Sequence, residues 1–311
     1  MIDRPRGVLR AALKGGAERA LVWSGAARVQ RRRMSGRVIV LAYHNIVPDD
    51  AAHVGDLANH LPLSSFVAQL AQLRRTHDVI PLSEAFTMPR GRSMRPRAVI
   101  TFDDAYRGSL VHGLAELVRQ QLPATFFIAP SFIGGGSFWW DALARRDGGL
   151  DPGLRERALT TLRGEDATVR SWATRHGYLI AKPTADACVC TEDELAHAAS
   201  TPGITFGAHT WAHPNLVQLL PNERAAELAR PLQWLRARFS NVLPWLAYPY
   251  GSFDRDVERA TATAGYEGAL TVNGGFIPVE AMNRFAIPRI NIPSGLSDVG
   301  FALCAAGVWP R

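Results

Sequence analysis

The stretch Ala98-Val99-Ile100-Thr101-Phe102-Asp103-Asp104 joins an apolar run to two adjacent carboxylates. A short, continuous run of β-branched and aromatic residues is typical of a strand that is buried on both faces. Neighbouring residues on a strand point to opposite sides, so Asp103 and Asp104 are expected to face different partners. One carboxylate can then bind a metal ion while the other faces a substrate or a water molecule.

Apolar runs of the same kind recur along the chain and alternate with stretches of helical periodicity. Buried strands are expected at residues 38–42, 79–82, 98–102, 124–128, 204–208, 243–248, 268–272 and 286–292. Helices are expected around residues 66–73, 114–118, 224–238 and 257–264. Pro231 should start, kink or split the third of these helices. This alternation predicts parallel βαβ units, and reactive residues at the carboxyl ends of strands favour a (β/α) barrel over an open sheet.

Two histidines four residues apart, His209 and His213, follow the expected strand at 204–208. A His-x-x-x-His pair can close on a single ion, and nitrogen with carboxylate ligands suits a divalent metal such as zinc. With Asp104 as third ligand, the set leaves room for water, as hydrolytic metal sites require. Each feature alone also occurs as a helix cap or an ordinary histidine pair. A third motif at a strand end, Tyr248-Pro249-Tyr250-Gly251, makes coincidence a poor explanation, and the sequence predicts a hydrolase.

The composition fits one large single-cored domain or two small ones: 311 residues, 47% apolar and 20% charged. The formal net charge of +7 is placed unevenly, because residues 1–37 contain ten basic residues against two acidic ones. The remainder of the chain is therefore close to neutral, which argues against a nucleic-acid groove in the main fold. No Gly-x-Gly-x-x-Gly follows the first expected strand, which argues against a nucleotide-binding fold.

Residues 1–37 are expected to form a basic amphipathic helical appendage, and residues 38–311 the barrel. The appendage either packs on the outside of the domain or contacts an anionic membrane surface. The chain shows no signal peptide and no run of roughly 20 apolar residues that could span a membrane. Three cysteines, two of them the closely spaced Cys188 and Cys190, fit free thiols. A cytoplasmic protein, with peripheral membrane association left open, is the expectation, and nothing indicates its oligomeric state.

Three segments together resemble the polysaccharide deacetylase family, the NodB-like carbohydrate esterases. They are Thr101-Phe102-Asp103-Asp104-Ala105-Tyr106, His209-Thr210-Trp211-Ala212-His213 and Tyr248-Pro249-Tyr250-Gly251. The segment Pro123-Ala124-Thr125-Phe126-Phe127-Ile128 resembles the family's next strand, and the likeness extends over residues 38–292. The resemblance implies a distorted (β/α) barrel that removes N-acetyl groups from an amino-sugar glycan with the help of one divalent metal ion. Zinc is expected, with cobalt, nickel and iron as alternatives.

The resemblance also assigns roles to residues of the motifs. In the family the first aspartate is the general base, so Asp103 is expected to accept the proton of the attacking water. The second aspartate and both histidines bind the metal, which makes Asp104, His209 and His213 the expected ligands. The backbone N–H of Tyr250 is expected to help hold the tetrahedral oxyanion.

Two departures from the family pattern concern the residues around the metal. Many members have an arginine where this chain has Ala247, and a late histidine that protonates the leaving amine, whereas no histidine follows His213 here. His44 is the expected proton donor, in the manner of poly-N-acetylglucosamine deacetylases with a Tyr-His near the start; a strand-end histidine bonded to backbone is the alternative. Arg289 is expected to replace the missing arginine and orient Asp103, with a surface salt bridge as the alternative.

The segment Phe138-Trp139-Trp140-Asp141 is expected in a loop at the mouth of the barrel. Trp139, Trp140 and Tyr248 are candidate platforms for sugar rings, and Asp141 a candidate acceptor for sugar hydroxyls. The alternative is that these aromatic residues pack an expected helical insertion, at about 147–183, onto the barrel. The remaining histidines have no partner at ligand spacing and are expected to be ordinary: His53, His60, His77, His112, His176 and His197.

The leading functional expectation is therefore hydrolysis of N-acetyl groups on a glycan or glycan precursor, in surface polysaccharide metabolism. The same site acting on a non-sugar amide or an O-acetyl ester is the second reading. A non-catalytic barrel that only binds glycans is the third. The complete set of base and ligands argues against it, because unused buried ligands carry a desolvation cost.

Overall fold

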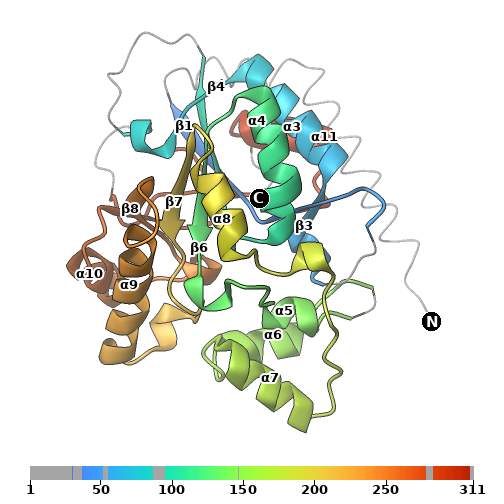
Figure 1. Ribbon diagram of the computed structural model, residues 1–311, viewed down its shortest axis with the longest axis vertical. Helices are drawn as coiled ribbons and strands as arrows, with labels where there is room; N and C mark the ends of the chain where they lie inside the picture. Colours follow the sequence, from blue (N-terminus) through green and yellow to red (C-terminus); the bar gives the residue numbers. More distant parts are fainter. Residues whose placement is uncertain are drawn as a thin grey trace.

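The computed structural model describes residues 37–51, 55–86, 95–145, 147–277 and 283–308, together with Gln30. The expected N-terminal appendage thus lies almost entirely outside the described residues. The described part of the chain is built on a curled parallel sheet with helices packed outside it (Figure 1). This arrangement is the alternating α/β class that the sequence predicts.

Eight strands form the main sheet. They are β1 (Val38–Tyr43), β4 (Asp78–Val79), β5 (Arg97–Phe102), β6 (Ala124–Ile128), β7 (Ile204–Ala208), β8 (Val242–Ala247), β9 (Gly268–Leu270) and β10 (Ile290–Asn291). The strand order is β10-β1-β5-β6-β7-β8-β9, with β4 beside the start of β5, and every pairing is parallel. A separate two-stranded sheet joins β2 (Asn45–Val47) to β3 (His60–Pro62). Because all eight strands run the same way, their carboxyl ends meet at one edge.

The two edges of the main sheet are linked by the segment 284–291. Ile287 forms a parallel bridge with Leu270 of β9, and the two-residue strand β10 pairs with Leu41 and Ala42 of β1. The expected strand at 286–292 is therefore reduced to a short connection. The sheet is a distorted, incompletely closed barrel, in agreement with the expected fold.

Helices on the outside cover the sheet. They are α3 (Leu63–Thr76), α4 (Leu114–Gln120), α8 (Glu192–Ala199), α9 (Pro221–Arg236), α10 (Arg255–Thr263) and α11 (Asp298–Ala305). Phe66, Leu70 and Leu73 recur at helical spacing on α3 and are fully buried, which explains why this stretch folds as a helix against the sheet. Pro231 neither starts nor ends α9, contrary to one sequence expectation. Its ring is buried, and packing of the helix against the core outweighs the missing N–H.

Three further helices lie together beyond the carboxyl end of β6: α5 (Trp139–Ala142), α6 (Pro152–Leu159) and α7 (Asp166–Arg175) (Figure 1). The last two fall within the insertion expected at about 147–183. The side chain of Asp151 caps α6 by accepting a hydrogen bond from the backbone N–H of Leu154 at 2.9 Å. Arg155 and Leu159 of α6 lie beside the residues of the sequence motifs at this edge of the sheet.

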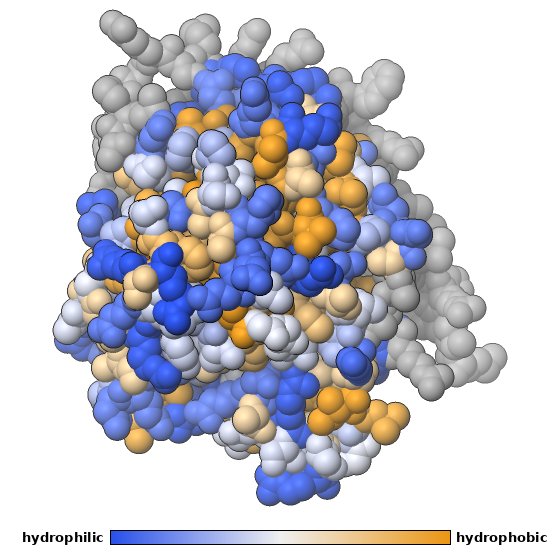
Figure 2. Space-filling model, viewed as in Figure 1, coloured by the Kyte–Doolittle hydropathy of each residue, from blue (hydrophilic) through white to orange (hydrophobic). Residues whose placement is uncertain are grey.

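The surface of the described residues is mixed. Exposed large apolar side chains are Val111, Val118, Leu179, Ile180 and Leu220. Figure 2 shows apolar patches over α4 and near α5–α7 that are separated by hydrophilic surface. Within the described ranges, no helix is both long enough and apolar enough to cross a bilayer. The three cysteines are free thiols, and Cys190 and Cys304 are buried.

Candidate active site

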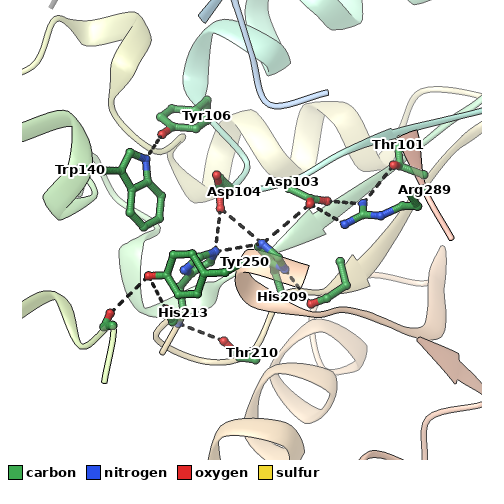
Figure 3. A network of polar contacts seen from close by, with 12 residues as sticks. Thr101, Asp103, Asp104, Tyr106, Trp140, His209, Thr210, His213, Tyr250 and Arg289 are labelled. Carbon is green, nitrogen blue, oxygen red and sulfur yellow. Dashed lines mark hydrogen bonds and ion pairs between the residues drawn. The ribbon is translucent and has the colours of Figure 1, made fainter. Parts of the chain in front are cut away.

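The three sequence motifs converge at the carboxyl ends of β5, β7 and β8. There they border a cavity of about 130 Å³. Its walls include nine of the expected site residues: His44, Asp103, Asp104, Trp139, Trp140, His209, His213, Tyr248 and Tyr250. Figure 3 shows Asp104, which follows β5, beside the histidine pair, and Asp103 between His209 and Arg289. Residues far apart in the sequence thus meet because parallel strands end on the same side.

The backbone of the motifs is bent into an unusual conformation. Among the described residues, seven non-glycine residues have positive φ, and five of them belong to these motifs. The five are Asp104 (70°), Ala105 (51°), Thr210 (62°), His213 (55°) and Tyr250 (58°). Such conformations cost of order 1–3 kcal/mol each and persist where the surrounding structure holds them, typically at functional sites. The strain turns the ligand side chains toward the cavity instead of continuing each strand.

Asp104, His209 and His213 form a buried cluster whose ligand atoms all lie within 4.8 Å of one another. The two Nε2 atoms are 3.1 Å apart, and Asp104 Oδ1 lies 3.5 Å from His209 Nε2 and 3.3 Å from His213 Nε2. Zinc is bound at about 2.0–2.2 Å by such ligands, so tetrahedral neighbours lie roughly 3.3–3.6 Å apart. The three separations therefore suit one ion at the centre of the cluster.

The hydrogen bonds around the cluster also suit a cation. Nδ1 of His209 donates to the carbonyl of Ala247 at 2.8 Å, which leaves the Nε2 lone pair directed at Asp104. Ala247 occupies the position where many relatives carry an arginine, and here its backbone orients a ligand. The Oδ1 atom of Asp104 is buried without a hydrogen-bond partner among the described residues. An unpartnered carboxylate oxygen is costly unless a cation or a proton accompanies it.

Burial shifts the proton equilibria of the cluster. It raises the pKa of Asp104 well above its usual range, and the nearby charges of Asp103 and Asp141 raise that pKa further. Burial lowers the pKa of both His209 and His213. The histidines are therefore neutral, as metal ligands must be, and a bound cation would restore the carboxylate form of Asp104.

Asp103 lies between the cluster and a buried guanidinium, with Oδ2 4.0 Å from Nε2 of His209 (Figure 3). Arg289 donates from Nη1 to Oδ1 and from Nη2 to Oδ2 of Asp103, both at 2.7 Å. It also donates to Oγ1 of Thr101 and to the carbonyl of Thr271. Burial alone would raise the pKa of Asp103, but the Arg289 charge reverses the effect and lowers it. The surface salt bridge considered for Arg289 is excluded, because its side chain is fully buried.

His44 lies between β1 and β2 and lines the same cavity. Burial lowers the pKa of His44 to about 4, although the charge of Asp103 acts in the opposite direction. The imidazole is therefore neutral near pH 7. A neutral imidazole cannot give up a proton to an amine unless it first receives one.

The expected aromatic residues lie at the cavity wall but are packed tightly. Trp139 is 2% exposed and donates from Nε1 to the hydroxyl of Tyr250 at 3.3 Å. Trp140 is 6% exposed, and its ring centroid lies 5.0 Å from that of His213. Tyr248 lines the cavity too, yet its hydroxyl donates to the carbonyl of Phe285. These side chains both pack α5 against the site and form part of its wall.

Asp141 lies elsewhere than expected. Its side chain is fully buried and does not line the cavity. Oδ1 accepts hydrogen bonds from the backbone N–H of Asp56 and from Nε2 of His60, and Oδ2 accepts one from the hydroxyl of Tyr106. Both oxygens are engaged inside the protein, so the position of Asp141 does not support a direct contact with sugar hydroxyls.

Several cavity residues were not anticipated from the sequence. They are Asp56, Asn59, Arg155, Leu159, Val272 and Asn291. None belongs to a motif, and Asp56 and Arg155, which lie 3.5 Å apart, are separated by 99 positions in the chain. His60, considered ordinary, is a buried partner of Asp141. No local pattern marks such residues, because tertiary contacts alone bring them to the site.

Comparison with known proteins assigns the chain to a class. The polysaccharide deacetylase family model matches residues 90–269, more than half of the chain. The protein belongs to the polysaccharide deacetylase family, whose members are hydrolases that act on N-acetyl sugars. Among individual proteins, YxkH of Bacillus subtilis (strain 168), named for its likeness to these deacetylases, is 24% identical over 111 residues. That match covers 36% of this chain and only 39% of the length of YxkH.

Solved structures of deacetylases share the fold. The chain resembles the Streptococcus pyogenes deacetylase PplD in complex with acetate, with 16% identity and a TM-score of 0.59 over 88% of this chain and 99% of that one. A de-N-acetylase from Aggregatibacter actinomycetemcomitans gives 14% identity and a TM-score of 0.61 over 86% and 99%. IcaB from Ammonifex degensii has 17% identity and a TM-score of 0.56, over 88% of this chain and 97% of that one. At these identities the likeness confirms the expected polysaccharide deacetylase fold and nothing finer.

Proposed function

We propose that the protein is a metal-dependent hydrolase that removes N-acetyl groups from an amino-sugar glycan or glycan precursor and releases acetate. One observation carries the proposal. A three-ligand cluster of Asp104, His209 and His213 shares a cavity with Asp103, which Arg289 holds ionised. A base beside a metal site is an arrangement that can hydrolyse an unactivated amide.

The donor set fits a divalent metal ion. Two imidazole nitrogens and one carboxylate oxygen suit zinc, and cobalt, nickel and iron are compatible with the same ligands. When bound, the ion would supply Lewis acidity, polarising the acetamide carbonyl and lowering the pKa of a nearby water molecule. Asp104, His209 and His213 would hold it, and the carbonyl of Ala247 would keep His209 in the required tautomer.

The remaining residues direct the proton and the developing charge. Asp103 accepts the proton of the attacking water, and the bidentate contact with Arg289 fixes the orientation of its carboxylate at the cavity wall. The backbone N–H of Tyr250 donates to the oxygen of the acyl carbon as it becomes negative. As the C–N bond breaks, one proton passes to the amine nitrogen. The water oxygen is retained in acetate.

The proton that reaches the amine is the one that Asp103 takes from water. We propose that His44 relays it, since its imidazole is neutral at rest and lines the same cavity. An alcohol leaves without such help more easily than an amine. The low pKa of His44 therefore favours O-acetyl esters as a second candidate substrate class for the same site.

The decisive experiment is to measure acetate release from N-acetylglucosamine oligomers by purified protein, with and without a chelator, alongside its metal content. Chelator-sensitive release supports the proposal. One metal ion per chain without acetate release would mean that the metal site is correctly assigned but that the natural substrate is a different one. Neither metal nor release would contradict the proposal and favour a barrel that only binds glycans.

The cellular setting rests on sequence alone. We propose a cytoplasmic protein that contacts membranes peripherally through its basic residues 1–37, where a precursor of a surface polysaccharide would be found. Deleting residues 1–37 should reduce binding to vesicles that contain anionic lipids. Unchanged binding of the shortened chain would remove the support for membrane contact.

A further inference from the structure

Asp56 lies on the wall of the catalytic cavity, although no sequence motif contains it. It belongs to the short loop before β3, and its side chain is 9% exposed. Asn59 of the same loop and Asn291 of β10 line the cavity as well. This wall is therefore polar, in contrast to the tryptophans that form another part of the lining.

A buried network holds the Asp56 loop in place. The backbone N–H of Asp56 donates to Oδ1 of Asp141 at 3.0 Å, and Nε2 of His60 lies 3.0 Å from the same oxygen. Asn45 donates from Nδ2 to Nδ1 of His60 at 2.9 Å, so Nε2 of that ring carries the proton and donates to Asp141. The network thus fixes both the loop and the tautomer of His60.

Gly55 shows how closely the loop approaches this network. Its φ is +121°, and an added Cβ would lie 2.6 Å from Nε2 of His60 and 2.7 Å from Oδ1 of Asp141. Only glycine permits this backbone and this approach. The buried Asp141 and His60 therefore act on the cavity indirectly, by presenting Asp56 to it.

The carboxylate of Asp56 is buried but has few hydrogen-bond donors around it. Oδ1 accepts a long hydrogen bond of 3.3 Å from the N–H of Ala58, and Oδ2 lies 3.5 Å from Nη1 of Arg155. An ionised carboxylate can accept about four hydrogen bonds. Arg155 belongs to α6, and its side chain is 53% exposed. Asp56 thus retains capacity to accept hydrogen bonds from a molecule in the cavity.

We propose that Asp56 is a specificity-determining residue that accepts hydrogen bonds from ring hydroxyls of the sugar whose acetyl group is removed. This inference rests on the proposed function and extends it to the substrate class, a neutral, polyhydroxylated ring. Asn59 and Asn291 add donors and acceptors to the same wall. Asp56 takes no part in the bond that breaks.

The test compares two substrates in the Asp56→Asn variant, which keeps the Oδ1 acceptor for Ala58. Hydrogen bonds to charged groups contribute about 1.5–3 kcal/mol, so kcat/KM for N-acetylglucosamine oligomers should fall about 10- to 100-fold, mainly through KM. Hydrolysis of 4-nitrophenyl acetate, which has no sugar, should fall far less than hydrolysis of the oligomers. Asp147→Asn is the matched control, because Asp147 is 68% exposed and outside the cavity lining.

Either of two outcomes would overturn the proposal. One is an equal loss of kcat/KM on both substrates, and the other is a change of KM no larger than that of the control. Either would mean that Asp56 does not bind the sugar hydroxyls. If the wild-type protein hydrolyses neither substrate, the role of Asp56 is tested by oligosaccharide binding, measured through tryptophan fluorescence. This measurement does not depend on catalysis. Tighter binding by wild type than by Asp56→Asn would support the role of Asp56 while the catalytic proposal fails. Equal affinities, or no binding, would refute it.

Discussion

Asp103 and Asp104 are neighbours in the chain with opposite electrostatic surroundings. Asp103 faces the Arg289 guanidinium, which lowers its pKa against the effect of burial. Asp104 faces two neutral imidazoles, and burial with nearby negative charge raises its pKa. The positive φ of Asp104 bends the backbone directly after β5, so the two side chains face different partners. Two identical side chains are thus prepared for two tasks, base and ligand.

The division of labour between these carboxylates predicts different losses. Asp103→Asn should lower turnover by about 10²- to 10⁴-fold, the usual contribution of a general base, while the metal content stays at the wild-type level. Asp104→Asn should lose both turnover and the bound metal. Elemental analysis of both variants beside acetate release makes the comparison. Full activity of Asp103→Asn would disprove its role as base.

His44 is predicted to matter for the leaving group. His44→Ala should impair release of acetate from N-acetylated sugars by at least about 10-fold more than from activated esters, because only the amine requires a proton. The ratio of kcat/KM values for the two substrate types measures the effect. The Asp147→Asn variant, altered at an exposed carboxylate, should leave that ratio unchanged. Equal losses on both substrate types would assign His44 a structural role.

At the scale of elements, the loop between the two histidines depends on helix α9. Glu227 accepts hydrogen bonds from the backbone N–H groups of Trp211 and Ala212 at 2.9 and 2.8 Å. Arg230, one turn farther along the helix, lies over the ring of Trp211 at 4.0 Å. Because His213 follows directly, α9 helps to fix the position of a metal ligand through its neighbours in the loop.

Glu227→Ala is therefore predicted to weaken metal binding. Groups that orient ligands typically change metal affinity by about 10- to 100-fold, and a loss near the lower end is expected because Trp211 keeps its contact with Arg230. Competition with a chromogenic chelator measures the affinity. Glu156→Ala, at an exposed position of α6, is the control. Unchanged affinity in Glu227→Ala would show that the loop holds its conformation without the Glu227 carboxylate.

At the scale of the whole molecule, the features visible in the sequence were those with a local cause. The strands that precede the motifs appear as apolar runs because they are buried on both faces, and β5, β6 and β7 lie where expected. The segment 286–292 is apolar but forms only two residues of strand, since it connects two edges of the sheet. Asp141 was predicted to contact the sugar because it follows two tryptophans, but its carboxylate is engaged inside the protein. Asp56 was not predicted, because contacts with residues distant in the sequence bring it to the cavity.

Metal binding should stabilise the entire fold, because the three ligands come from β5 and β7 and the loops that follow them. An ion present at 100 times its Kd adds about 2.7 kcal/mol to the free energy of unfolding. At roughly 2–4 °C for each kcal/mol, the melting temperature should rise by roughly 5–10 °C when zinc is restored to chelator-treated protein. His209→Ala should show no such rise, since it lacks a ligand but keeps the rest of the chain. A rise of equal size in that variant would place the stabilising ion somewhere other than the Asp104, His209 and His213 cluster.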